Sequence, residues 1–209
     1  MADSNRAHSW MAECTSCHGD ACAPGDSTRL HNFQVIDCET RRVTSGPTPC
    51  AYVALSYVWG SRSKDDAEYI FPNLPERLPA TIEDAIVVTK RLGYQYIWID
   101  RYCINQNDPD DKMRQILQMG AIYAAAQVTI VAASGDGPQH GLPGVRQPRD
   151  VSTPYGEVVR SVALVLTSVA AGYSVFDSPW ASRAWTIQEG YLSRRRLFFT
   201  DRTMLYVCG

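Results

Sequence analysis

The sequence predicts an α/β protein with a mainly parallel β-sheet and helices on both of its faces. Three apolar segments, at 52–57, 94–100 and 128–132, are rich in β-branched and aromatic residues, as buried strands are. Two segments between them, at 81–93 and 108–126, carry apolar residues at the spacing of an amphipathic helix. Such an alternation of strands and helices is typical of parallel sheets with right-handed crossovers.

The composition limits the protein to a few broad classes. With 209 residues, of which 45% are hydrophobic, the chain can bury one full core. A formal net charge of -2 gives no general attraction to nucleic acid or to an anionic membrane, so we expect neither as a partner. Residues 1–10 lack the apolar segment of a signal peptide, and no stretch approaches the roughly 18 apolar residues of a membrane span. These features predict a cytoplasmic protein.

The first 50 residues differ in pattern from the rest. They have little apolar periodicity and end in a stretch rich in glycine, proline and threonine at 45–49. We therefore predict an irregular, cysteine-containing arm at 1–50 and a folded domain at 51–209. The seven cysteines are an odd number without the spacing of a disulfide framework, so we expect them to be mostly reduced.

The first half of the domain contains a strand, a helix and a second strand. The strand at 52–57 is followed by a proline-rich segment at 61–79, which predicts an extended excursion. The first helix begins at Thr81, whose side chain is a favourable N-cap, and Gly93 ends it. The next strand then runs to Asp100.

The second helix has the clearest start signal. Asp108 is a favourable N-cap, Pro109 fits the first helical turn, and the apolar stripe continues to Ala126. The strand at 128–132 follows directly, and its continuous apolar composition fits a strand covered on both faces. The dense glycines and prolines of segment 134–150 predict a long surface loop.

The C-terminal part contains an added strand at 158–167, a helix at 180–192 and a hairpin. The strands of the hairpin are expected at 197–200 and 204–208, with a tight turn between them. Because the sequence stops directly after a strand, we expect the domain to be truncated at its C-terminal end.

Three sequence blocks carry a resemblance to a known family. They are YVALSYVWG at 52–60, YIWIDRYCINQ at 96–106 and RAWTIQE at 183–189. Together, and in this order, they resemble the signature of fungal heterokaryon incompatibility (HET) domains over residues 52–208. The resemblance implies a role in fungal non-self recognition and programmed cell death.

The chain has a more distant resemblance to TIR domains, which have a flavodoxin-like fold and a catalytic glutamate four residues after a tryptophan. Trp185 and Glu189 form that pair here. The resemblance implies a TIR-like fold, cleavage of NAD by Glu189, and homo-oligomers that act with other cell-death signalling proteins. The excursion at 61–79 and a HET-specific insertion at 134–170 depart from the TIR pattern. The fold therefore transfers more readily than the activity.

The predicted helix at 180–192 has residue types that suit an N-glycosidase. Ser182, Trp185 and Glu189 are spaced i, i+3 and i+7, so they would share one helix face. A carboxylate beside an aromatic ring can hold ribose hydroxyls and stabilise an oxocarbenium-like centre. A structural role fits as well, with Trp185 in the core and Glu189 in solvent or in an ion pair. Both interpretations stay open.

Further binding candidates follow the predicted strands or precede the last helix. Ligands of parallel sheets bind at the carboxyl ends of the strands. Hydroxyls, aromatic rings, a carboxylate and arginines at that edge would suit a ribose, a base and a phosphate. The candidates are Ser56, Tyr57, Trp59, Gly60, Asp100, Arg101 and Arg183. The alternatives are that the rings pack in the core, that Asp100 caps a turn, and that the arginines form ion pairs on the surface.

Thiols in the N-terminal arm offer an alternative metal site. A C-x2-C pair and two further cysteines match the ligand chemistry of zinc, and free thiols in a flexible arm are the simpler interpretation. The set is Cys14, Cys17, Cys22 and Cys38, with His18 and His31 as substitutes. The stretch CTSCH at 14–18 also matches a haem attachment motif, but that chemistry needs an export route for which the sequence has no signal.

The motifs of several common enzyme classes are absent. Patterns of the Walker A, GxGxxG, GxSxG and HExxH types do not occur, which argues against ordinary kinases, dehydrogenases, serine hydrolases and zincins. Cys103 and His140 could together form a thiol nucleophile. The simpler interpretation is that Cys103 is an ordinary semi-buried cysteine. The resemblances to HET and TIR domains imply a cell-death signalling domain that needs no cofactor and cleaves NAD or a related nucleotide at its N-glycosidic bond. The rival is a non-catalytic, self-associating interaction module.

Overall fold

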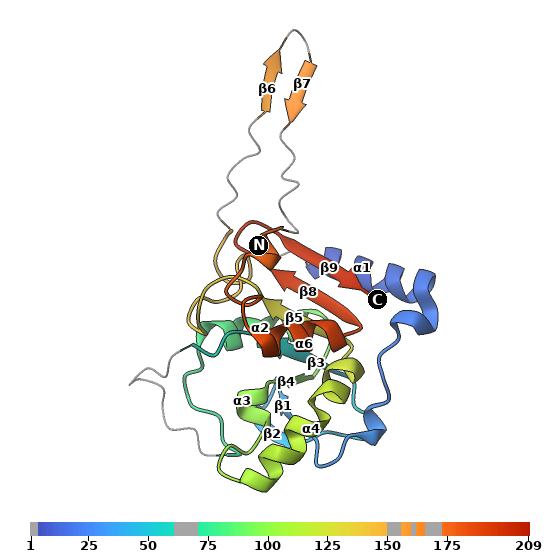
Figure 1. Ribbon diagram of the computed structural model, residues 1–209, viewed down its shortest axis with the longest axis vertical. Helices are drawn as coiled ribbons and strands as arrows, with labels where there is room; N and C mark the ends of the chain where they lie inside the picture. The colour runs from blue at the N-terminus through green and yellow to red at the C-terminus, as the bar shows by residue number, and fades with distance from the viewer. Residues whose placement is uncertain (1–3, 61–70, 150–155, 160–161, 166–172) are drawn as a thin grey trace.

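The computed structural model describes residues 4–60, 71–149, 156–159, 162–165 and 173–209. Seven strands form one mixed sheet in the order β2-β1-β4-β3-β5-β8-β9, and β6 pairs with β7 apart from it (Figure 1). The strands are β1 (Gln34–Asp37), β2 (Arg42–Ser45), β3 (Tyr52–Ser56), β4 (Tyr96–Trp98), β5 (Val128–Ala132), β6 (Gly156–Val159), β7 (Val162–Val165), β8 (Arg195–Phe199) and β9 (Met204–Cys208). The helices are α1 (Ser4–His18), η1 (Gly19–Cys22), η2 (Ser27–Arg29), α2 (Ala80–Arg91), α3 (Asp100–Cys103), α4 (Pro109–Ala125), α5 (Tyr173–Phe176) and α6 (Ala184–Leu192).

The centre of the sheet is parallel, as the sequence predicts. Strand β3 lies between β4 and β5, with Ala54 opposite both Trp98 and Thr129, and β8 continues the parallel order beside β5. Every residue of β3 and β5 is buried, which explains their continuous apolar composition. The outer pairs, β2 with β1, β1 with β4 and β8 with β9, are antiparallel. The sheet is therefore mixed, and the expectation of a mainly parallel sheet holds only for its centre.

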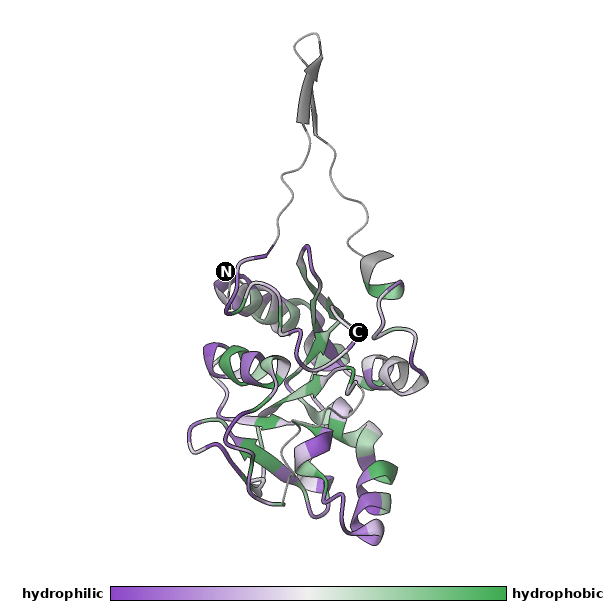
Figure 2. Cartoon of the chain, turned by 90° about the vertical axis from the view of Figure 1, so that its left-hand side faces the viewer, coloured by the Kyte–Doolittle hydropathy of each residue, from purple (hydrophilic) through white to green (hydrophobic). Residues whose placement is uncertain are grey.

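Helices cover both faces of this sheet. Helices α1 and α2 lie on one face, and α4 and α6 lie on the other, while the hydrophobic residues concentrate between these layers (Figure 2). Helix α4 begins where the sequence predicts, because the Asp108 side chain accepts hydrogen bonds from the backbone N–H groups of Asp110 and Asp111. Helix α2 is also confirmed, although its side-chain cap is not: Pro79 occupies the N-cap position.

The N-terminal segment is not an irregular arm, and that expectation is wrong for the residues described. It contains α1 and the strands β1 and β2, and Ile36 of β1 pairs with Ile97 of β4. Val35 and Ile36 are fully buried in the core. The Trp10 ring of α1 stacks on Tyr206 of β9 at 6.2 Å. Strands of four residues are too short to show a clear period in the sequence, which is why the pattern misses them.

Two predicted elements at the C-terminal end differ from the structure. The single strand expected at 158–167 is instead the antiparallel pair β6 and β7, with residues 160 and 161 between them. The helix expected at 180–192 begins only at Ala184. The predicted hairpin is confirmed as β8 and β9, with Phe199 opposite Met204. Segment 134–149 is irregular, as its glycines and prolines indicate.

Among the described residues, no helix is both long enough and apolar enough to cross a lipid bilayer.

Candidate functional site

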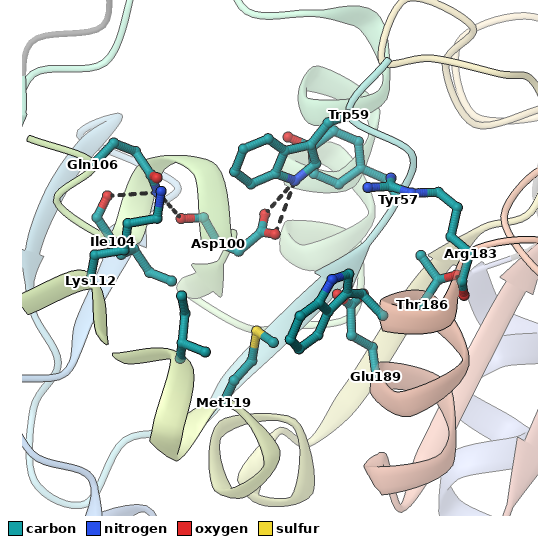
Figure 3. Close-up of a pocket in the computed structure, with 12 residues that line it drawn as sticks. Tyr57, Trp59, Asp100, Ile104, Gln106, Lys112, Met119, Arg183, Thr186 and Glu189 are labelled. Carbon is teal, nitrogen blue, oxygen red and sulfur yellow. Dashed lines mark hydrogen bonds between the residues drawn. The ribbon is translucent and has the colours of Figure 1, made fainter. Parts of the chain in front are cut away.

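A pocket of about 250 Å³ opens where the carboxyl ends of β3 and β4 meet the start of α6 (Figure 3). This edge is where ligands of parallel sheets usually bind. The pocket combines aromatic rings, two carboxyl groups and two basic side chains. Its walls are formed by Tyr57, Trp59, Asp100, Ile104, Gln106, Lys112, Ile116, Met119, Arg183, Trp185, Thr186 and Glu189.

The side chain of Glu189, which lies on α6, is held by a chain of side-chain hydrogen bonds. Its side chain is 6% exposed, and its Oε2 accepts a hydrogen bond of 2.6 Å from the hydroxyl of Ser56. That hydroxyl accepts one of 2.7 Å from Nε1 of Trp180. Within the described part of the chain, Glu189 forms no ion pair. The structural alternatives for Glu189, a solvated position or an ion pair, therefore do not fit the geometry.

Burial controls the charge of this carboxyl group. Burial, and next the nearby Asp100, raise the pKa of Glu189 to about 8, against the smaller lowering effects of Ser56, Tyr123 and Arg183. At neutral pH the side chain therefore carries its proton in the ligand-free pocket. A positive charge placed beside it would favour the ionised form.

Asp100 is the second carboxyl group of the pocket. It follows β4 and starts the short helix α3, where its carboxylate accepts hydrogen bonds from Nε1 of Trp59 at 2.9 and 3.1 Å. The backbone N–H of Arg101 donates a third, at 2.7 Å. Burial raises the pKa of Asp100 to about 6, and these donors together with Arg183 oppose the rise. The N-cap position of α3 belongs to Ile99, so Asp100 holds only the N–H of the next residue, and its carboxylate lines the pocket.

The hydroxyl of Tyr57 is an unsatisfied donor in the same pocket wall. Tyr57 is 4% exposed, and its oxygen has no hydrogen-bond partner among the described residues. Burial, followed by the charges of Asp100 and other neighbours, raises its pKa well above the ordinary range, so the group stays a neutral donor. A buried donor without a partner costs free energy, which a bound ligand or water would recover.

Two basic side chains also line the pocket, Arg183 on the side of Glu189 and Lys112 on the opposite side (Figure 3). Arg183 precedes α6, and Figure 3 shows its side chain reaching toward Tyr57. Its charge lowers the pKa of both Asp100 and Glu189, yet it forms no ion pair with a described residue. Lys112 enters from α4. Arg101 instead lies over the Trp59 ring, with its Cζ 5.8 Å from the ring centre, and does not line the pocket.

The structure places the other predicted site residues differently. Ser182 is exposed and precedes α6, so it does not share a helix face with Glu189, and its hydroxyl donates to the carbonyl of Pro179. Trp185 is 55% exposed at the rim of the pocket rather than in the core. Gly60 has a φ of 69° and lies against Gly137, where a side chain would clash. Ser56 acts behind Glu189 rather than on the pocket surface.

One wall of the pocket was missed by the sequence analysis. Lys112, Ile116 and Met119 of α4 line the pocket beside Gln106, which follows α3. Their spacing of i, i+4 and i+7 is that of one helix face. The signal was present in the sequence, but the pattern alone does not tell which face of α4 meets a ligand.

The alternative sites also change. The Cys103 thiol is buried and accepts a hydrogen bond from the backbone of Ile99, while His140 pairs with Asp201, so no thiol–imidazole nucleophile forms. A Cys/His cluster that could hold a metal ion does exist, but its members differ from the predicted set. Cys14, His18, Cys22 and Cys208 have ligand atoms within 4.8 Å of one another. Cys17 is exposed and Cys38 is buried in the core cluster around β1, and neither is part of it.

Comparisons with known proteins identify the family. Residues 52–189 match the family described as "Heterokaryon incompatibility protein (HET)", a region that holds every residue of the pocket wall. The "Heterokaryon incompatibility protein 6, OR allele" of Neurospora crassa is 30% identical over 96 residues, or 40% of this chain and 14% of that protein. The chain thus matches only a small part of this relative's length. No solved structure matches. Because the family match spans more than half of the sequence, the chain belongs to the heterokaryon incompatibility (HET) family.

Proposed function

We propose that this chain signals non-self recognition and cell death by cleaving the N-glycosidic bond of NAD or a related nicotinamide nucleotide, with Glu189 as the catalytic carboxylate. One observation carries the proposal. Asp100 and Glu189 are two carboxyl groups with raised pKa values in one aromatic pocket. Such pairs are typical of sites that use acid and base chemistry.

The pocket complements a ligand that is cationic at one end and anionic at the other. A nicotinamide ring bound through its ribose carries a positive charge, which would favour the ionised forms of Asp100 and Glu189. Trp59 and Trp185 offer faces for stacking such a ring. Arg183 suits a phosphate group. The volume of about 250 Å³ is below the range of about 300–1,000 Å³ for drug-sized ligands, so we expect it to hold the nicotinamide ribose end.

The proposed reaction is a hydrolysis. The bond between the ribose C1′ and the nicotinamide nitrogen breaks, its electron pair neutralises the ring nitrogen, and nicotinamide leaves uncharged. The positive charge that develops on the ribose is stabilised by the Glu189 carboxylate. Water attacks C1′ and gives its proton to the same carboxylate, which releases it to solvent. In this proposal Tyr57, whose hydroxyl has no partner among the described residues, donates a hydrogen bond to a ribose oxygen.

The resemblance to TIR domains supports the assignment of roles on α6. The helix turns the Glu189 side chain into the protein and leaves Trp185, four residues earlier, at the rim. This placement fits a carboxylate that acts on the ribose and a ring that packs on the base.

The experiment is to incubate the concentrated full chain with NAD and to follow nicotinamide by chromatography. Release that is saturable in NAD and absent after heat denaturation is expected. An intact protein that releases no nicotinamide, at concentrations where it also self-associates, would contradict the proposal.

A second candidate function, the non-catalytic interaction module, is favoured by an exposed apolar surface. Phe176 and Tyr191 are 80% and 83% exposed, and together with Val207 they line a shallow hollow over α6 and β9. Exposed apolar surface of this kind marks protein contacts. On this proposal the chain forms homo-oligomers and recruits other cell-death signalling proteins through the hollow. Tyr191→Ser would then abolish both assembly and killing, and the wild-type protein would kill without releasing nicotinamide from NAD.

A further inference from the structure

The Cys/His cluster lies where the first and last elements of the chain meet. Cys14 and His18 are four residues apart on α1, so they share one helix face, and Cys22 follows four residues later at the end of η1. Cys208 reaches them from the end of β9, 190 residues after His18. The fold therefore gathers three thiols and one imidazole from distant parts of the sequence.

The four ligand atoms are close enough together for a tetrahedral metal site. Nδ1 of His18 lies 3.7 Å from Sγ of Cys22 and 3.3 Å from Sγ of Cys208, and all four ligand atoms lie within 4.8 Å of one another. Bonds of about 2.3 Å from zinc to sulfur and about 2.0 Å to nitrogen give ligand separations of roughly 3.5–3.8 Å in a tetrahedron. The ligand atoms would need to draw together by about 1 Å at most to bind the ion.

We propose that Cys14, His18, Cys22 and Cys208 bind one zinc ion in a closed, structural Cys3His site. Three soft sulfur ligands and one imidazole are a donor set that selects zinc, and four protein ligands leave no open position for a substrate. The site ties α1 and η1 to the edge strand β9. It is independent of the function proposed for the pocket.

The ion would be bound by thiolates. Metal binding displaces the protons of its thiol ligands, here Cys14, Cys22 and Cys208.

Arginines next to the cluster offset its charge. Zinc with three thiolates and a neutral imidazole carries one net negative charge. The Arg194 guanidinium donates to the carbonyl of Ala21, and Arg195 donates to the hydroxyl of Thr15 on α1. The two side chains thus place positive charge against the segments that carry the ligands, which is how groups around a metal site stabilise it.

The test begins with the metal content of the full chain, purified under reducing conditions and dialysed against zinc-free buffer. We expect one zinc per chain, and we expect a cobalt-substituted protein to show the absorption of a tetrahedral cobalt–thiolate centre. Cys14→Ser and Cys208→Ser should each lose most of the metal. Cys17→Ser, on the same helix but outside the cluster, should keep it, and His31→Ala should keep it where His18→Ala does not.

A variant could lose the metal only because it folds poorly, so a second test uses the wild-type protein alone. Removing the metal with a chelator should lower the Tm, and adding one equivalent of zinc should restore it. The proposal is overturned if reduced wild-type protein binds no zinc or cobalt. It is equally overturned if mass spectrometry finds a disulfide among these cysteines in reduced protein, or if Cys17→Ser loses as much metal as Cys14→Ser.

Discussion

The hydroxyl of Ser56, at the end of β3, donates a hydrogen bond of 2.6 Å to Oε2 of Glu189, 133 residues later on α6. The same hydroxyl accepts a hydrogen bond from Trp180, so one serine fixes both the helix and the loop before it. The central parallel strand thereby positions the carboxyl group on which the proposed chemistry depends. The sequence alone does not indicate that Ser56 and Glu189 are in contact.

Replacing Ser56 should cost stability. Ser56→Ala leaves the buried indole N–H of Trp180 without its acceptor, and we expect a loss of about 1–3 kcal/mol in the free energy of unfolding. Urea denaturation measures it. Ser182→Ala is the matched control, because its exposed hydroxyl bonds only to its own loop, and should change stability by less than about 0.5 kcal/mol. Equal stability of the two variants would show that the Ser56 bridge does not form.

The stability of the wild type should fall as pH rises through a window set by Glu189. Burial raises its pKa from 4.5 to about 8, so between these values the folded protein holds a proton that the unfolded chain has lost. Folding is therefore increasingly disfavoured across the window, and the penalty is complete above pH 8. Glu189→Gln has no such proton. Between about pH 5 and pH 9 its free energy of unfolding should therefore rise by a few kcal/mol relative to that of the wild type.

Thermal melts at several pH values check this prediction. Glu39→Gln, which replaces an exposed carboxylate that pairs with Lys90 on the surface, is the control for the loss of a negative charge. A Glu189→Gln difference from wild type that does not grow with pH would mean that burial does not raise the pKa of Glu189 in the folded protein.

Arg183 should affect substrates with phosphate groups selectively. Arg183→Gln removes a charge that no described residue pairs with, and the loss of a charged hydrogen bond is worth about 1.5–3 kcal/mol. We expect KM for NAD to rise roughly 10–100-fold, while KM for nicotinamide riboside, which has no phosphate, stays within about twofold. Arg29→Gln, which alters an exposed pair with Asp26, serves as the control. Equal losses for both substrates would remove Arg183 from phosphate binding.

The N-terminal strands should be needed for folding. Ile36 is fully buried and pairs with Ile97 of β4, so Ile36→Ala should destabilise the domain by about 2–5 kcal/mol. Thr44→Ala, at an exposed position of β2, should have little effect. Denaturation curves compare the two. A chain without residues 1–45 that still unfolds cooperatively at the wild-type midpoint would show that these strands are an appendage.

Local signals explain which parts of the fold can be predicted from the sequence. The cap at Asp108 and the apolar run of β5 depend on neighbouring residues, so α4 and β5 are found almost to the residue. Strand β1 carries little signal, because its four residues become a strand only by pairing with β4. Membership of Cys208 in the Cys/His cluster is equally hard to predict. Cys208 is far from Cys14 in the sequence, and the two come together only in the folded protein.

The site shows the same division. Asp100, Tyr57 and Trp59 are predicted because they follow strands, and Glu189 because it lies four residues after Trp185. The raised pKa of Glu189 is not predictable, since it results from burial and from the carboxyl group of Asp100 at the start of α3. Ser182 is misplaced because residues 180–183 form turns before α6 instead of its first helical turn.

The most direct test of the central claim compares nicotinamide release from NAD by wild type, Glu189→Gln and Glu39→Gln at neutral pH. Glutamine matches the shape of the protonated side chain, so Glu189→Gln should fold normally there. Loss of a carboxylate that stabilises the transition state should reduce the rate by roughly a hundredfold or more, while Glu39→Gln keeps the wild-type rate. A Glu189→Gln protein that is at least as stable as wild type and releases nicotinamide as fast would contradict the account.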